Sequence, residues 1–179
     1  KSVLELGEYA EVVSPKEYDM AVKAGFSPKD IIYNGVIDDF YAKYVVAING
    51  GVVNIENIDE FKQFVDYCNE KEQHVCLGVR LNIDIGSGVF SRFGIPVDGN
   101  DFRWLADKSN HPYIDIKSVH CHLSQARSLQ FFKRRVEVMA EAAKALGADI
   151  IDIGGNMFGR MDGAFRDQFP EYVPSFEEY

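Results

Sequence analysis

The sequence predicts an α/β fold, a (β/α)8 TIM-type barrel of which about six βα units are present. Short runs rich in Val and Ile alternate with helical stretches through short connections. These runs are apolar on both faces, as expected of parallel strands that helices cover. Polar residues follow or end the runs, and the carboxyl ends of barrel strands carry functional groups in this way.

Six segments are expected to be strands because they combine apolar character, β-branched residues and a length of four to nine residues. They are Ala10–Val13, Ile31–Asn34, Val52–Ile55, Val75–Ile83, Ile116–Leu123 and Ile150–Ile153. The polar residues at or after their ends are Ser14, Asn34, Glu56, Asn82, His122 and Gly154. A doubly wound sheet is the competing architecture, but it requires a glycine-rich turn after its first strand, where this chain has Ser14-Pro15. We therefore prefer the barrel.

Four helices carry their own start, stop or packing signals. The first begins with a capping box, in which Ser14 accepts from an amide and Glu17 reaches back to the cap, and it ends at Gly25. The others are expected over 37–49, 58–69 and 129–146. Gly50-Gly51 stops the second and Gly147 the last. The expected buried stripes are Phe40, Tyr44, Val45 and Ile48 in the second helix, and Phe61, Phe64, Val65 and Cys68 in the third.

The composition is that of a globular protein, with 46% hydrophobic and 26% charged residues. A net charge of -9 argues against nucleic acid as a partner, because phosphate binding requires a basic face. No apolar run approaches the ~20 residues of a membrane span, so no membrane partner is expected. Cys68, Cys76 and Cys121 are too few for a disulfide framework and are expected to be buried free thiols, which suits a cytoplasmic location.

Two histidines in one strand form the first candidate site. His120 and His122 are two residues apart, so they point to the same face. They could bind a metal, contact a flat ligand or be hydrogen-bonded interior residues. A metal requires a third ligand, and no HExxH pattern accompanies them. No metal is therefore assigned.

Two further features lie within a strand or directly after one. Gly154-Gly155 follows an apolar strand, and such a turn either binds an anion or is an ordinary turn. Arg80 lies within an apolar strand and needs a carboxylate or ligand partner. Glu11, alone inside its own strand, is the expected carboxylate, and a purely structural ion pair is the alternative.

Six segments in order resemble the ornithine/diaminopimelate/arginine decarboxylases, which share the alanine-racemase-like barrel. They are Ala10–Glu17 (AEVVSPKE), Ala24–Gly35 (AGFSPKDIIYNG), Arg80, Ser91–Ile95 (SRFGI), His120–Ser124 (HCHLS) and Ile153–Asn156 (IGGN). The resemblance implies a pyridoxal 5'-phosphate cofactor and the decarboxylation of an amino acid similar to diaminopimelate, ornithine or lysine.

The resemblance also implies roles for single residues. His122 would stack on the pyridine ring, and Arg80 with Glu11 would form a charged pair beside the Schiff base. The residues that would bind the phosphate or another part of the cofactor are Ser124, Gln125, Gly154, Gly155, Asn156 and Asn34. The sequence departs from the family pattern where Ser124 replaces Gly, Gln125 replaces Ser and Asn156 replaces the third loop glycine.

The resemblance assigns residues 1–179 to part of the cofactor-binding barrel domain. The family's Schiff-base lysine would precede it, and the remaining catalytic residues and a C-terminal β domain would follow it. We therefore expect this chain to be a segment of a longer, homodimeric enzyme, and we expect the segment alone to be inactive. A cofactor-binding protein without catalysis and an amino-acid racemase are the alternatives. A barrel acting on phosphorylated sugars would leave His120 and His122 without a task.

Overall fold

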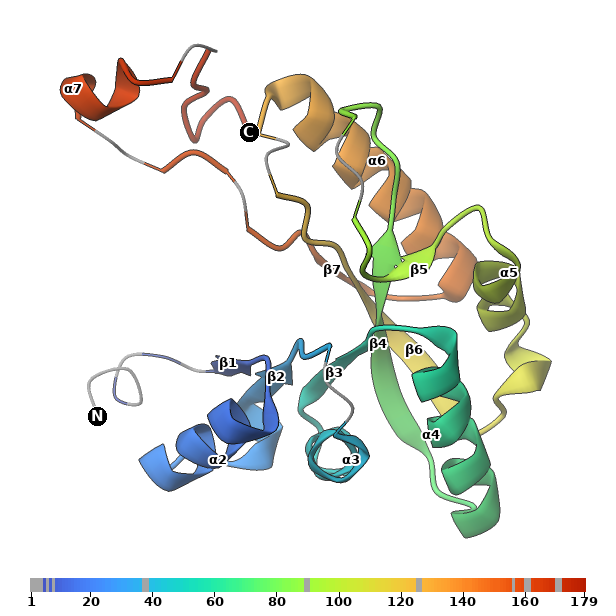
Figure 1. Cartoon of the computed structure of the whole chain (residues 1–179). Helices are drawn as coiled ribbons and strands as arrows, with labels where there is room; N and C mark the ends of the chain where they lie inside the picture. The colour runs from blue at the N-terminus through green and yellow to red at the C-terminus, as the bar shows by residue number, and fades with distance from the viewer. Residues whose placement is uncertain are drawn as a thin grey trace.

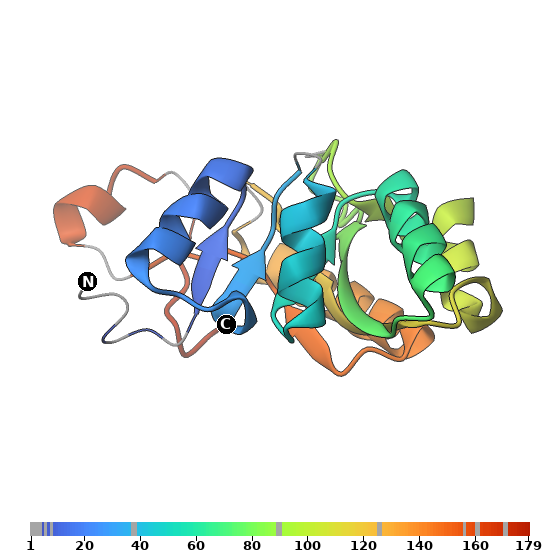
Figure 2. The ribbon, with the colours of Figure 1, turned by 90° about the horizontal axis from the view of Figure 1, so that it is seen from below.

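A computed structural model describes residues 5, 7, 9–36, 39–88, 91–124, 127–155, 157–159, 162–169 and 172–179. Six parallel strands form one curved sheet in the order β1-β2-β3-β4-β6-β7, and a two-residue strand, β5, pairs with β4 beside it. The predicted incomplete barrel is thus confirmed as a half-barrel, with helices packed along the sheet (Figures 1 and 2).

The strands lie close to their predicted positions. They are β1 (Ala10–Val12), β2 (Ile31–Tyr33), β3 (Val52–Ile55), β4 (Val75–Asn82), β5 (Ile95–Pro96), β6 (Ile114–His120) and β7 (Ile150–Asp152). The sequence patterns did not predict β5. The strand predicted over 116–123 starts two residues earlier and ends three residues earlier, so His122 lies just beyond the carboxyl end of β6.

The helices that cover the sheet also follow the sequence. They are α2 (Pro15–Ala24), α3 (Phe40–Ile48), α4 (Ile58–Lys71), α5 (Asn100–Ala106), α6 (Leu129–Leu146) and α7 (Gly163–Arg166), with short 3-10 helices η1 (Pro28–Asp30) and η2 (Lys108–Asn110). Both ends of α2 and α6 were predicted, whereas α5 and α7 were not. Gly25 and Gly147 end α2 and α6 with left-handed backbones.

The capping box of α2 forms with one difference from the prediction. The Ser14 hydroxyl accepts a hydrogen bond from the amide of Glu17 at 3.3 Å. The carboxylate of Glu17 reaches back to the amide of Val13 at 2.8 Å, one residue before the cap. Two backbone amides near the start of the helix are therefore satisfied by side chains, which stabilises its first turn.

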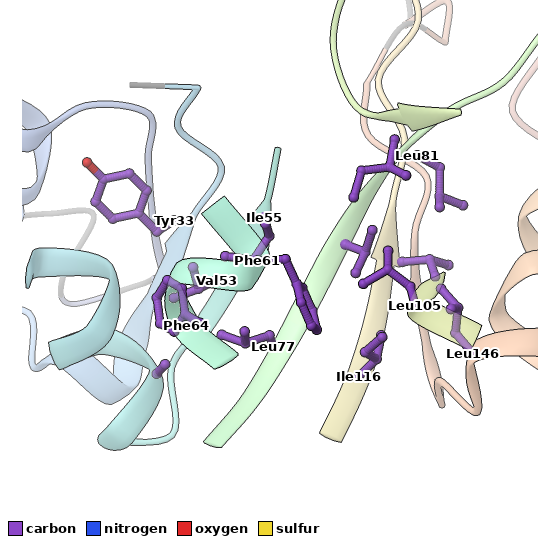
Figure 3. Close-up of a cluster of buried hydrophobic side chains, with 14 of the residues drawn as sticks. Tyr33, Val53, Ile55, Phe61, Phe64, Leu77, Leu81, Leu105, Ile116 and Leu146 are labelled. Carbon is purple, nitrogen blue, oxygen red and sulfur yellow. The ribbon is translucent and has the colours of Figure 1, made fainter. Parts of the chain in front are cut away.

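The hydrophobic core lies between the strands and the helices (Figure 3). Phe61 and Phe64 of α4 are fully buried, as is Val53 of β3. The predicted stripe of α4 is confirmed, since Val65 and Cys68 are buried as well. Helices α5 and α6 contribute further buried side chains to this cluster.

The predicted buried face of α3 was right only in part. Phe40 and Tyr44 are partly buried and pack against the core, whereas Ile48 is exposed. The most deeply buried residues of α3 are Ala42, Lys43, Val46 and Ala47, which were not predicted. The ammonium of Lys43 donates to the Gly35 carbonyl oxygen at 2.8 Å and pairs with Glu60 of α4. A charged residue therefore faces the interior, and the apolar pattern alone could not reveal this face.

Candidate active site

A row of polar side chains crosses the carboxyl ends of the central strands. Arg80 of β4 lies in register with His120 of β6, and His120 lies in register with Asp152 of β7. Glu56 follows β3 directly. The carboxyl ends of parallel strands form the functional face of a barrel. This row is therefore the place to look for a binding site.

The partner of Arg80 is Glu56. Guanidinium nitrogen Nη1 lies 3.0 Å from carboxylate oxygen Oε2, and both side chains are about nine-tenths buried. The second carboxylate oxygen accepts the amide of Gly94 at 2.9 Å, and the Phe93 ring lies 4.8 Å from the guanidinium carbon. The predicted pairing of Arg80 with Glu11 was wrong. Strand β3 lies next to β4, whereas β1 lies three strands away, so Glu56 reaches the arginine first.

Glu11 instead ends a chain of hydrogen bonds that crosses the sheet. The Ser118 hydroxyl donates to the side-chain oxygen of Asn54 at 3.1 Å. The Asn54 amide donates to Asn34 at 2.6 Å, and the Asn34 amide donates to the Glu11 carboxylate at 2.8 Å. In this series of hydrogen bonds, each residue donates to the next one toward Glu11. The carboxylate is therefore held in position by uncharged partners.

The two histidines have different surroundings. His120 is buried, and its Nδ1 has no hydrogen-bond partner within the described part of the chain. Burial lowers the pKa of His120, Arg80 and His122 lower it further, and the carboxylates of Asp152 and Glu11 oppose the shift. His120 is therefore a neutral interior residue at pH 7. His122, by contrast, is exposed.

The glycine turn after β7 packs directly on His122. The amide of Gly155 donates to His122 Nδ1 at 3.2 Å, which leaves the proton of a neutral ring on Nε2. Gly154 has a φ of 60°, and a Cβ there would lie 2.6 Å from the carbonyl oxygen of Cys121. The amide of Gly154 donates to the Asp152 carboxylate at 2.9 Å. The absence of side chains thus lets the turn close against the end of β6.

A cavity of about 340 Å³ opens beside His122. Its lining residues are Arg80, Ser91, Arg92, Phe93, His122, Leu123 and Ser124. The volume suits a small-molecule ligand. The wall combines two guanidinium groups with aromatic rings, which is appropriate for a flat ligand that carries negative charge.

The structure brings only some of the predicted site residues together. His122, Arg80 and Ser124 share the cavity, and Gly155 contacts His122. Asn34 donates to Glu11 in the separate series of hydrogen bonds that starts at Ser118. Gln125 and Asn156 lie outside the described residues.

Sequence reasoning gave no role to several residues of this region. Glu56 was noted as polar at a strand end, and Arg92 and Phe93 were noted as part of a family segment, but neither signal assigned a contact. Asn54 and Ser118 carried no signal beyond being polar residues in apolar strands. Arg135 of α6, which donates to the Gly155 carbonyl oxygen at 3.2 Å, was hidden within the polar pattern of its helix.

The residues present fit pyridoxal phosphate. The His122 ring is exposed and lines the cavity, and the Gly155 amide holds it at its edge through Nδ1, which suits stacking against a pyridine ring. Arg92 gives the cavity positive charge, whereas the charge of Arg80 is balanced by Glu56. Among the described residues, no group of three or more His, Cys, Asp or Glu side chains could hold a metal ion. The described helices include none that is long and apolar enough to span a bilayer.

Curated relatives of similar sequence are diaminopimelate decarboxylases. The chain is 25% identical over 185 residues to the enzyme of Zymomonas mobilis, covering 95% of this chain and 43% of that protein. It is 28% identical over 170 residues to a probable chloroplastic diaminopimelate decarboxylase of Oryza sativa, covering 86% of this chain and 34% of that protein. The chain thus spans less than half the length of these relatives.

Solved structures share the fold. Diaminopimelate decarboxylase from Helicobacter pylori complexed with L-lysine has a TM-score of 0.65 at 22% identity, over 86% of this chain and 44% of that one. An alanine racemase from Clostridium difficile has a TM-score of 0.60 at 16% identity, over 87% of this chain and 47% of that one. The half-barrel is therefore alanine-racemase-like.

A family model described as the pyridoxal binding domain of pyridoxal-dependent decarboxylases matches residues 1–178. This match covers nearly the whole chain and agrees with the resemblance read from the sequence. The chain belongs to the pyridoxal-dependent decarboxylase family and corresponds to its pyridoxal-binding domain.

Proposed function

We propose that the whole protein is a pyridoxal-phosphate-dependent decarboxylase acting on a diamino acid. The observation that carries the proposal is the exposed His122 ring, held by the Gly155 amide beside a cavity that Arg80 and Arg92 line. This arrangement suits a flat, negatively charged aromatic cofactor. Bound pyridoxal phosphate supplies the electron sink that allows an amino acid to lose carbon dioxide from its Cα.

The residues of this chain would bind and orient. His122 would stack on the pyridine ring and keep its Nε2 proton directed away from the glycine turn. Arg80, held in place by its ion pair with Glu56, would present its remaining guanidinium N–H groups to the cavity. Glu11, held by Asn34, would present a carboxylate on the wall of the half-barrel. Ser124, Gln125 and Asn156 would complete the cofactor contacts.

Diaminopimelate is the preferred substrate in this proposal, with ornithine and lysine as the closest alternatives. Two relatives that cover most of this chain carry the name diaminopimelate decarboxylase. The net charge of -9 is compatible with a substrate that bears two ammonium groups. A nucleic acid or a membrane surface finds no basic counterpart in this composition.

The proposal also concerns the parts of the parent protein outside this chain. They would supply the Schiff-base lysine, the remaining catalytic residues and a C-terminal β domain, so the 179-residue chain by itself would not turn over. The complete enzyme would be a cytoplasmic homodimer. Sedimentation of the active full-length protein as a monomer would contradict the dimer.

The test is carbon dioxide release by the full-length protein from meso-diaminopimelate, ornithine and lysine, with pyridoxal phosphate present. We expect turnover of one of them and loss of cofactor affinity in His122→Ala. His74→Ala is the matched control, because His74 lies at the opposite end of β4 against Tyr113. Cofactor binding without turnover of any amino acid would support a non-catalytic binding protein. Interconversion of enantiomers would support a racemase.

A further inference from the structure

Arg135 is a fully buried arginine in the middle of α6, the helix that packs on β6 and β7 (Figure 1). Its neighbours on the buried face of the helix include Val138 and Met139. The guanidinium carbon lies 5.0 Å from the centre of the Phe132 ring. A cation in such apolar surroundings is costly unless a charge or several acceptors compensate it.

The described residues compensate Arg135 only in part. Nη1 donates to the carbonyl oxygen of Gly155 at 3.2 Å, while Nε and Nη2 are buried without a hydrogen-bond partner. No carboxylate of a described residue forms an ion pair with it. Burial accordingly lowers the pKa of Arg135. Lys43, the other fully buried cation among the described residues, differs because it has both the Gly35 carbonyl and the Glu60 carboxylate.

Arg135 contacts the Gly154–Gly155 turn, and this contact indicates a role for its charge. Gly155 accepts from Arg135 through its carbonyl and donates to His122 through its amide. Gly154 donates its own amide to Asp152. Both glycine amides of the turn are therefore already used inside the protein, so neither is free to bind an anion as a glycine-rich turn usually does. An anion at this turn needs another source of positive charge, and Arg135 is in contact with the turn.

We propose that Arg135 is a positioning residue that makes the Gly154–Gly155 turn a phosphate site. Its buried guanidinium fixes the Gly155 carbonyl and supplies the charge that balances the phosphate of the cofactor. Asp152, which lies at the same turn, adds negative charge that Arg135 must also offset. This inference rests on the proposed function, because it takes the phosphate to be that of pyridoxal phosphate.

The test compares pyridoxal phosphate with pyridoxal, which lacks the phosphate, in the full-length protein. Their affinities are measured by absorbance titration in wild type, Arg135→Met, Arg135→Lys and the control Lys43→Met. Arg135→Met is expected to reduce the preference for the phosphorylated ligand by about tenfold to a hundredfold, the range for the loss of a unit charge several ångströms from the phosphate. Arg135→Lys should retain most of the preference, and Lys43→Met should retain all of it. Inorganic phosphate should compete with pyridoxal phosphate for binding to the wild-type protein. It should no longer compete in Arg135→Met.

A folded Arg135→Met protein with the wild-type preference would overturn the proposal. If that variant does not fold, the wild-type protein provides the answer through the buried Nε–H resonance of Arg135, assigned from the Arg135→Lys spectrum. A shift of this signal on addition of inorganic phosphate supports the proposal, and an unshifted signal at saturating phosphate overturns it. If the wild-type protein bound neither pyridoxal phosphate nor pyridoxal, the proposed function itself would be wrong.

Discussion

Asn54 of β3 and Ser118 of β6 touch each other although β4 lies between their strands. They meet over Gly78, where a Cβ would lie 1.9 Å from the Asn54 side-chain oxygen and 2.1 Å from the Ser118 hydroxyl. The missing side chain of β4 thus leaves room for a hydrogen bond between non-adjacent strands. This bond is the first link of the chain that ends on Glu11.

Gly78→Ala should destabilise the protein by about 2–4 kcal/mol, through overpacking and loss of a buried hydrogen bond. Urea unfolding measures the change. Gly163→Ala is the control, because a Cβ at Gly163 meets nothing within 4 Å. Adding Ser118→Ala to Gly78→Ala should restore part of the loss, since it removes one of the two clashing atoms. A Gly78→Ala protein as stable as wild type would show that Asn54 and Ser118 separate freely.

Glu56→Ala should cost about 3–5 kcal/mol of unfolding free energy, because it leaves the buried Arg80 guanidinium without its carboxylate. Glu56→Gln, which keeps the shape and one acceptor, should cost less. The exposed pair of Lys71 and Glu70 provides the contrast, since Lys71→Ala should have almost no effect. A Glu56→Ala protein as stable as wild type would show that Arg80 does not depend on the Glu56 carboxylate.

His120 should make the protein less stable as the pH falls below about 6.5, the ordinary pKa of histidine. Because burial lowers the pKa of His120, the unfolded chain binds a proton at a higher pH than the folded protein does. The unfolded state therefore gains protons first, and the free energy of unfolding falls by up to about 1.4 kcal/mol per pH unit until the folded-state pKa is reached. Above that window this contribution is constant. Unfolding at pH 5 and pH 8 in wild type and His120→Gln isolates it, and an equal pH dependence in both would refute it.

Cys76 should react with a thiol reagent well before the other two cysteines. It is exposed, whereas Cys68 and Cys121 are buried, so the expectation that all three are buried was wrong for Cys76. Burial raises the pKa of Cys121 to about 11 and also raises that of Cys68, which reduces the reactive thiolate further. Native alkylation with mass mapping should label one site, and Cys76→Ser should abolish the fast phase. Rapid labelling of Cys121 would indicate that the end of β6 opens.

Local signals predicted most of the fold. Helix α6 has the predicted ends because Ser128 caps its start and Gly147 supplies the left-handed residue that ends it. The burial of Lys43 in α3 was missed because its stabilising partner, Glu60, belongs to another helix. Strand β5, with two residues, is too short to have a periodicity.

A site residue could be predicted where its place in the sequence alone determines where it lies in the fold. His122 follows a strand, and strand ends face the mouth of a barrel. The carboxylate partner of Arg80 was not predictable in this way, because the choice between Glu11 and Glu56 depends on which strands are neighbours. Arg135 could not be found from its helix alone, since only the packed structure shows that its charge faces the interior.

The order of the strands has a consequence for how the polypeptide acquires its shape. Each strand of the main sheet pairs with its nearest neighbours along the chain, apart from the small detour of β5. These neighbours are nevertheless parallel, so each pairing spans a crossover through a helix, as between Val75 of β4 and Ile114 of β6. Pairing of this kind is slow to form because the loop must close before the contacts are made. The wall that carries Arg80, His120 and His122 should therefore assemble late in folding, after the local helices have formed.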